Sequence, residues 1–318
     1  MLNIAYCCDD NYIPYVGVSM ISCIENNLND FNKIIFHIII DSNVTDESKD
    51  KLKRNISKYQ NCEVIFYPFN PEGPMPISDY HPIVNAILFI PNLIPVDKLL
   101  FLDADTLVLD SLKELFKLDL EDNYCAGVFD VIPPYFKEKI GFSKEDKYYN
   151  SGFVLMDLER MRKDSIGGKF LNELSKEYKY PDQDIINIVL KDKIFTLPPK
   201  YNFHGYFLEW DSKNVLKVYS MDYEYYYSEE DIKKSKENII CTHFLNLFSD
   251  VPWKDETNPM YDEFKKYATK TSFSNDEIFV SSNFPRWKIL AHDVVKKFQN
   301  PLVVLLVKSY LEKLFKNK

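Results

Sequence analysis

Short apolar runs alternate with amphipathic segments along the first 70 residues of the chain. Residues 3–8, 33–40 and 62–67 form the apolar runs, and residues 15–26 and 46–59 between them have helical character. Strands that are apolar on both faces are typical of parallel strands covered by helices on both sides. The alternation therefore predicts an α/β fold with a doubly wound sheet.

The same alternation continues to about residue 245. Residues 68–82 contain five prolines, which predicts a loop. Beyond it we expect further elements, with strands at 99–102, 124–129, 153–156 and 238–242 and helices at 83–89, 169–178 and 182–190. Polar residues follow or border several of these strands, at Asp9, Asp103, Asp105, Asp130 and Asn150. Ligands of open α/β sheets gather at the carboxyl ends of strands, so these residues predict one shared site.

Asp103 and Asp105 follow a buried strand with a spacing of two residues. Side chains alternate across a strand, so both carboxylates face the same way where the chain leaves the sheet. Two like charges this close repel unless a cation with oxygen ligands lies between them. The pair therefore predicts a divalent-metal site for a phosphorylated substrate, although acidic residues also end strands simply to begin a turn.

Composition narrows the class of protein and its compartment. The 318 residues carry a net charge of −9, which argues against nucleic-acid binding. The six cysteines show no Cys-x-x-Cys spacing, so reduced thiols are expected. The chain begins with a strand-like segment rather than a basic stretch and a long apolar one, so we expect no secretory signal and a cytoplasmic protein.

The C-terminal part of the chain has the opposite charge. Residues 285–318 hold eight lysines and arginines and two acidic residues, a net charge of +6 that leaves −15 on the rest. Residues 302–315 predict a helix with one apolar and one lysine-rich face. Its apolar run is far shorter than the roughly 20 residues that span a bilayer. The helix either packs against the body or lies peripherally on an anionic membrane surface, here the inner face of the cell membrane.

Several spaced motifs together resemble the family 8 retaining glycosyltransferases, which include glycogenin and bacterial lipopolysaccharide galactosyl- and glucosyltransferases. The resemblance covers about residues 3–255. The motifs are Cys7-Cys8-Asp9-Asp10-Asn11-Tyr12, Leu102-Asp103-Ala104-Asp105, Phe136-Lys137-Glu138-Lys139-Ile140-Gly141, Tyr149-Asn150-Ser151-Gly152, Pro181-Asp182-Gln183-Asp184 and Thr242-His243-Phe244.

This resemblance implies a fold, a division of the chain and an activity. The fold would be of the GT-A type, with a Rossmann-like, mixed and mainly parallel sheet flanked by helices. Residues 1–260 would form the nucleotide-sugar transferase domain, and residues 261–318 a small, helical, basic segment. The activity would be transfer of a hexose, glucose or galactose, from a UDP-sugar to a glycan or a lipid-linked saccharide. Mn²⁺ would be the cofactor, with Mg²⁺ as the alternative.

The resemblance also implies roles for individual residues. Asp103, Asp105 and His243 would bind the metal. The uracil and ribose would contact Cys7, Asp9, Asn11, Tyr12 and Asp103, and the sugar of the UDP-sugar would contact Asp130, Asn150, Ser151, Asp182 and Gln183. Gln183 occupies the position of the family's candidate nucleophile. Because an amide oxygen is a weak nucleophile, we assign Gln183 to stabilising an oxocarbenium-like state, with Asp182 orienting sugar hydroxyls and Asp130 in the same catalytic group.

The chain departs from the family pattern at three positions, two of which normally carry positive charge. Ala86 stands where the family usually has an arginine, and Asn246 and Val251 stand where it expects a glycine and a lysine. Lys254 is the nearest substitute along the sequence. These departures keep open a second hypothesis, a family member that binds UDP-sugars with weak or no transfer.

A phosphatase of the haloacid dehalogenase type is a further alternative, because those enzymes also use an Asp-x-Asp motif at a strand end. Their pattern has threonine or valine where this chain has Leu107, and it usually lies near the N-terminus. The sequence therefore favours the transferase.

Deleting residues 285–318 should abolish binding to anionic liposomes, because this segment carries the excess positive charge and the amphipathic face. Hydrolysis of the sugar nucleotide should stay measurable in the truncated chain. Co-sedimentation with anionic vesicles measures the binding, with neutral vesicles as the control. Liposome binding that survives the deletion would contradict the membrane role.

Overall fold

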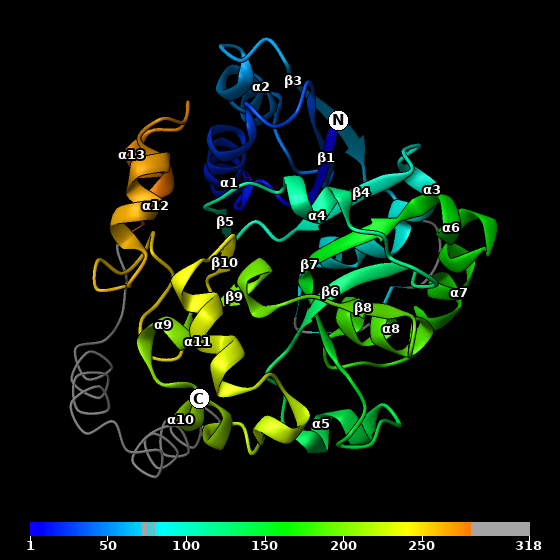
Figure 1. The fold of residues 1–318 in the computed structure, drawn as a ribbon. Coiled ribbons are helices and arrows are strands. Elements are labelled where there is room, and N and C mark those ends of the chain that lie inside the picture. Colours follow the sequence, from blue (N-terminus) through cyan, green and yellow to red (C-terminus); the bar gives the residue numbers. More distant parts are fainter. Residues whose placement is uncertain (72–74, 77, 79, 281–318) are drawn as a thin grey trace, which may run out of the picture.

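The computed structural model describes residues 1–71, 75, 76, 78 and 80–280, and a seven-stranded sheet forms its centre (Figure 1). Three parallel neighbours begin it, β1 (Leu2–Cys8), β2 (Ile34–Ile40) and β3 (Cys62–Pro68). The helices α1 (Ile13–Asn27) and α2 (Asp46–Ile56) connect them. The elements predicted over the first 70 residues are confirmed.

The second half of the sheet is mixed. β4 (Lys98–Leu102) lies parallel beside β1, and β7 (Tyr149–Asp157) runs antiparallel between β4 and β6 (Cys125–Phe129). β8 (Ile194–Thr196) pairs with β6 in parallel and ends the order β3-β2-β1-β4-β7-β6-β8. The expected mixed, mainly parallel sheet is confirmed. Because β7 is reversed, its first residues lie at the edge where β4 and β6 end.

Several elements differ from the sequence prediction: the helix expected at 169–178 is α7 (Ile166–Glu173), and the strand expected at 238–242 is β10 (Cys241–His243). Two further elements differ in extent or kind. The strand expected at 153–156 begins at Tyr149, so Asn150 and Ser151 lie inside β7 and not before it. Tyr149 already pairs with Phe129 of β6, which extends the strand through the polar residues. The helix expected at 83–89 is the 3₁₀ helix η1 (Pro82–Phe89), followed by α3 (Ile90–Leu93). Pro91 has no backbone N–H to continue one regular helix.

Helices cover both faces of the sheet. Ile4 and Tyr6 of β1 pack in one hydrophobic cluster with α1, whereas Ala5 between them packs in a second cluster with Ile87 and Ile185. This alternation gives two apolar layers, as expected for a doubly wound fold. The other helical elements before β10 are α4 (Lys113–Lys117), α5 (Pro134–Lys139), α6 (Leu158–Lys163), α7 (Ile166–Glu173), α8 (Pro181–Val189), η2 (Pro199–Tyr201), α9 (Tyr206–Glu209), α10 (Ser212–Val218), η3 (Tyr223–Tyr225) and α11 (Glu229–Glu237).

A second, three-stranded sheet adjoins the first (Figure 1). β5 (Thr106–Val108) follows β4 almost at once and pairs antiparallel with β10 (Cys241–His243). β10 also pairs in parallel with β9 (Phe203–His204). The register sets His243 opposite Thr106, directly after Asp105. This small sheet therefore determines where the only histidine of the predicted metal site lies.

Residues 261–280, which are the described part of the expected C-terminal segment, pack against the rest of the protein. α12 (Tyr261–Ala268) and α13 (Asn275–Ile278) contact α1, and Phe264 and Phe273 belong to the same hydrophobic cluster as β1. The amphipathic helix expected at 302–315 lies outside the described residues. Among the described helices, none has the length and apolar character required to cross a membrane.

Candidate active site

A pocket of about 550 Å³ lies where the carboxyl ends of β1, β4 and β6 meet the small sheet. Its lining brings together most of the residues singled out by the sequence, namely Cys7, Asp103, Asp105, Asp130, Asn150, Ser151, Asp182, Gln183 and His243. Asp9, Asn11 and Tyr12 lie outside this lining, in the turn between β1 and α1. There Asp9 accepts hydrogen bonds from the Asn11 side chain and the Tyr12 backbone. Their nucleotide contacts stay a prediction.

Asp103, Asp105 and His243 form a compact triad. The Nε2 atom of His243 lies 3.1 Å from Oδ1 of Asp105 and 3.7 Å from Oδ2 of Asp103. Backbone hydrogen bonds fix both acidic residues: Asp103 N–H donates to Gly152 at 2.9 Å, and the carbonyl of Asp105 accepts from Phe244 N–H at 3.0 Å. The triad is therefore held by the sheets themselves and not by a mobile loop.

The charges of the triad depend on one another. Burial raises the pKa of Asp103 to about 7, against the attraction of His243 and with a further contribution from Asp105. Burial alone would raise the pKa of Asp105 as well, but His243 lowers it below its usual range. Burial disfavours the charged form of His243, yet the carboxylates of Asp105, Asp103 and Asp130 together outweigh burial and raise its pKa to about 9. Without a cation the triad is thus held by an ion pair between His243 and Asp105.

The triad fits a divalent metal ion. One ligand atom from each residue lies within 4.8 Å of the others, and within the described part of the chain no other such group of three is found. Two carboxylates and one imidazole suit Mn²⁺ better than Ca²⁺. The backbone of Gly152 runs directly under the triad, where an added Cβ would lie 2.4 Å from Cε1 of His243 and 2.5 Å from Oδ2 of Asp103. The geometry of the triad therefore depends on a glycine at position 152, where there is no room for a side chain.

Gln183 is the centre of a hydrogen-bond network beside the triad. Its Nε2 donates to Oδ2 of Asp130 at 2.8 Å, and its Oε1 accepts from the backbone N–H of Ser151 at 3.0 Å and from Asn150 at 3.1 Å. A carboxylate partner on one side and an N–H partner on the other fix which way the amide points. Gln183 is only 6% exposed. It joins α8, β7 and the end of β6 at one point.

The two acids that flank Gln183 have different surroundings. Asp182 lines the pocket and accepts a hydrogen bond from Ser151 Oγ at 2.8 Å, while burial raises its pKa to about 6. Asp184 instead accepts from the Tyr148 hydroxyl at 2.5 Å and from the Tyr180 N–H at 2.9 Å. Asp184 therefore anchors the start of α8, and Asp182 is available to a ligand.

The pocket lining contains no lysine or arginine among the residues that the structure describes. Ala86, at the position of the family's arginine, is fully buried in a hydrophobic cluster. Asn246 lines the pocket, and Val251 is half-buried against the core. The departures noted in the sequence thus leave the described pocket with carboxylates and one histidine as its charged groups.

Glu209 holds the loop that follows β10. Its carboxylate accepts the backbone N–H groups of Leu247, Phe248 and Ser249 at 2.7, 2.9 and 2.7 Å, and the Ser249 hydroxyl donates to it as well. Consecutive N–H groups of this kind form a nest that binds an anion. Glu209 therefore fixes the loop that carries Asn246 to the pocket.

Sequence reasoning missed Glu209 together with Asn202, His204 and Tyr206, which lie in or behind the pocket wall. Tyr206 lines the pocket, and the other three support residues that line it or the loop beside it. No motif marks them, since they are polar residues scattered through a segment without clear periodicity. Only the pairing of β9 with β10 brings this segment to the site.

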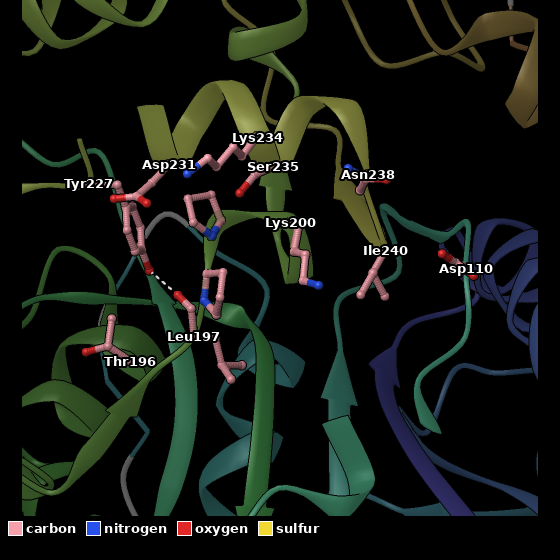
Figure 2. Close-up of a pocket in the computed structure, with 12 residues that line it drawn as sticks. Asp110, Thr196, Leu197, Lys200, Tyr227, Asp231, Lys234, Ser235, Asn238 and Ile240 are labelled. Carbon is pink, nitrogen blue, oxygen red and sulfur yellow. Dashed lines mark hydrogen bonds between the residues drawn. The ribbon is translucent and has the colours of Figure 1, made fainter. Parts of the chain in front are cut away.

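A larger pocket of about 640 Å³ lies between α11 and the segment Thr196–Lys200 (Figure 2). Tyr227 closes one side, where its hydroxyl donates to the carbonyl of Leu197 at 2.6 Å. Lys234 at its rim pairs with Glu230 at 2.6 Å. Within the described residues, the lining of this pocket holds no group of three metal ligands like the triad.

Replacing Gly152 with alanine should weaken Mn²⁺ binding by roughly 100-fold, because the new Cβ would displace His243 and Asp103. Isothermal titration calorimetry with Mn²⁺ measures the affinity. Gly168→Ala is the matched control, since a Cβ there meets no atom within 4 Å. Unchanged Mn²⁺ affinity in Gly152→Ala would show that the triad is not the metal site.

Residues 3–257 match the sequence profile of Glycosyl transferase family 8. A lipopolysaccharide 1,2-glucosyltransferase of Escherichia coli is 30% identical over an alignment 331 residues long, which covers 98% of this chain and 88% of that protein. General stress protein A of Bacillus subtilis (strain 168) is 25% identical, with 86% of this chain and 95% of the relative covered.

Solved structures share the fold. The galactosyltransferase LgtC, in complex with donor and acceptor sugar analogues, superposes with a TM-score of 0.67 at 24% identity, over 87% of this chain and 98% of that chain. The WbbM bifunctional glycosyltransferase in its apo form gives a TM-score of 0.73 at 20% identity, over 87% of this chain and 51% of that chain. These likenesses confirm the GT-A type fold. With a family match across most of its length, the chain belongs to glycosyltransferase family 8.

Proposed function

We propose that the chain is a metal-dependent, retaining hexosyltransferase that moves glucose or galactose from a UDP-sugar to a saccharide or glycolipid acceptor. Family membership supports the reaction class, and the printed activity of the Escherichia coli relative, a lipopolysaccharide 1,2-glucosyltransferase, supports a surface glycan as the acceptor. The pocket supports the rest of the proposal, because it joins a metal triad to a sugar-sized polar network.

The charge of the pocket is the observation that carries the proposal. Asp103, Asp105, Asp130 and Asp182 all line it, and no lysine or arginine of the described residues does. A diphosphate would be repelled by these carboxylates unless a cation stood between them. Metal binding and nucleotide binding should therefore be tightly coupled in this chain.

Asp103, Asp105 and His243 would hold Mn²⁺, with Mg²⁺ as the alternative. The bound ion would supply positive charge next to the departing diphosphate, which lowers the energy of the state in which the anomeric bond breaks. Cys7, at the end of β1, lines the same pocket beyond the triad. Of the expected nucleotide contacts, Cys7 and Asp103 therefore share the pocket with the metal ligands, which supports the proposal.

The network around Gln183 would hold the sugar. Asp130 lines the pocket with both oxygens held by Val131 N–H and Gln183 Nε2; burial raises the pKa of Asp130, and these hydrogen bonds oppose that rise. A fixed negative charge stabilises the positive charge that develops on the sugar ring. The Oε1 of Gln183 already accepts hydrogen bonds from Ser151 and Asn150, which leaves it poorly suited to attack carbon. We therefore favour retention by attack of the acceptor on the face that the UDP leaves.

The acceptor and the cellular location of the enzyme are part of the same proposal. We propose a cytoplasmic protein that reaches a lipid-linked saccharide at the inner face of the membrane through residues 285–318. Support comes from the net charge of +6 on that segment and from the lipopolysaccharide glucosyltransferase relative. The division into a transferase domain, residues 1–260, and a C-terminal segment, residues 261–318, also stays a proposal.

A second candidate function is UDP-sugar binding with weak or no transfer. The observation that favours it is the loss of the expected cations, since Ala86 is buried in the core and Val251 is apolar. Weaker charge compensation at the diphosphate would slow bond cleavage more than it weakens binding of the uridine.

Hydrolysis of one UDP-sugar from a panel that includes UDP-glucose and UDP-galactose should require Mn²⁺, and EDTA should reduce it to background. Calorimetry should detect UDP binding with Mn²⁺ and none with EDTA, because no lysine or arginine of the described residues lines the pocket to balance the diphosphate. UDP binding that persists in EDTA would contradict the coupling. Tight binding of UDP and Mn²⁺ without hydrolysis of any sugar would favour the second candidate.

Gln183→Ala should lower turnover by roughly 100-fold, because the sugar loses the group that holds Asp130 in place. The affinity for UDP should stay near that of the unchanged protein, since Gln183 lies at the sugar end of the pocket. Steady-state kinetics and calorimetry measure the two quantities, with the exposed Gln60→Ala as the control. Loss of UDP binding in Gln183→Ala would refute the stabilising role.

A further inference from the structure

Three buried polar atoms behind the metal triad have no hydrogen-bond partner among the described residues. They are Nδ1 of His243, Nε2 of His204 and Oδ1 of Asn202. Their side chains are 2%, 1% and 1% exposed. Buried polar groups are almost always paired, with protein or with an ordered water, so three unpaired atoms in one place require an explanation.

The small sheet brings these residues together. β9 and β10 lie side by side (Figure 1), and their register places His204 directly beside His243. The two imidazole rings are nearly perpendicular, at 79°, with centroids 6.2 Å apart. Asn202 enters from just before β9 and donates its Nδ2 to Oδ1 of Asn150 at 2.9 Å. Asn150 Oδ1 also accepts from Gly152 N–H, which identifies this atom as an oxygen. The Asn202 amide therefore points its nitrogen at Asn150, and its own Oδ1 has no hydrogen-bond partner among the described residues.

The neighbours of His204 determine which of its nitrogens carries the proton. The Tyr206 hydroxyl bonds to Nδ1 of His204 and has no other acceptor among the described residues. The tyrosine proton therefore points at Nδ1, and the proton of neutral His204 lies on Nε2. His243 turns Nε2 toward the acids, and its Nδ1 carries a proton both in the ion pair with Asp105 and with a metal ion on Nε2. His243 Nδ1 and His204 Nε2 are thus N–H donors on neighbouring strands, and Asn202 Oδ1 is an acceptor just before one of these strands.

We propose that one buried water binds here, accepting from His243 Nδ1 and His204 Nε2 and donating to Asn202 Oδ1. A water with two to four polar partners is stable inside a protein. A histidine that binds a metal usually gives its other N–H to an acceptor, which fixes the plane of the ring. His204 is then a positioning residue for the metal ligand. The inference rests on the metal site of the proposed function.

This water would also join the two ends of the pocket. Tyr206 lines the pocket and reaches the water through His204, while Asn202 reaches Asn150 and, through it, Gln183. The metal ligand and the sugar network would share one buried polar chain. A change at residue 204 should therefore alter metal binding without removing any ligand of the metal.

The test uses the full chain without a sugar nucleotide. His204→Phe keeps the size of the ring and removes its hydrogen bonds. It should weaken Mn²⁺ binding, measured by calorimetry, by about 10-fold to 100-fold. It should also shift the visible absorption of Co²⁺ bound in place of Mn²⁺, because the ligand field reports the orientation of His243. His204→Gln, whose amide N–H can replace Nε2–H, should restore most of the affinity.

His37→Phe is the matched control, because His37 is buried and bonded to Tyr67 and Asn3 in the other sheet. It should lower the melting temperature and leave Mn²⁺ affinity and the Co²⁺ spectrum unchanged. A crystal structure of the unchanged protein with Mn²⁺ should show the water on all three partners, whether or not His204→Phe folds.

Two results would overturn the inference alone: His204→Phe with full Mn²⁺ affinity and an unchanged Co²⁺ spectrum, or an ordered structure in which no water touches His243 Nδ1. Failure of the unchanged protein to bind Mn²⁺ would overturn the metal site, and this inference with it.

Discussion

The pairing of β10 with β5 positions the whole candidate site. Asp103 and Asp105 are the first and last residues of the three-residue link between β4 and β5, and His243 joins them only because β10 runs antiparallel to β5. Backbone hydrogen bonds at both ends of the link keep the acidic residues in place. A metal-ligating group far along the chain is thus located by main-chain geometry, which tolerates little displacement.

Negative charge sets the chemistry of the pocket. The protein holds its buried carboxylates with hydrogen bonds, from Val131 and Gln183 to Asp130 and from Ser151 to Asp182. At the triad, the ion pair between His243 and Asp105 balances part of the charge. Ala86, at the position of the family's arginine, is buried in the core, and no lysine or arginine of the described residues lines the pocket. A bound cation is therefore needed to balance the remaining negative charge. Such a site is stabilised by its ligands more than by its own contacts.

The reversed strand β7 connects the metal end of the pocket to the sugar end. Gly152 passes under the triad, and Asn150 and Ser151 next to it bond to Gln183. Polar residues in a central strand are costly unless they are paired, and here each has a partner. A rigid strand therefore fixes the separation between the metal ligands and the sugar-binding amides, as precise catalysis requires.

The sequence by itself determined the alternation of strands and helices, the paired aspartates and the order of the motifs. These depend on local periodicity and on neighbours in the chain, as in the apolar run Ile34–Ile40. Only the tertiary structure decided that β7 is reversed, that Asn150 lies inside it, and that His204 and Glu209 support the site. Strand direction and register come from contacts between distant segments, and neither leaves a periodic signal in the residues that make them.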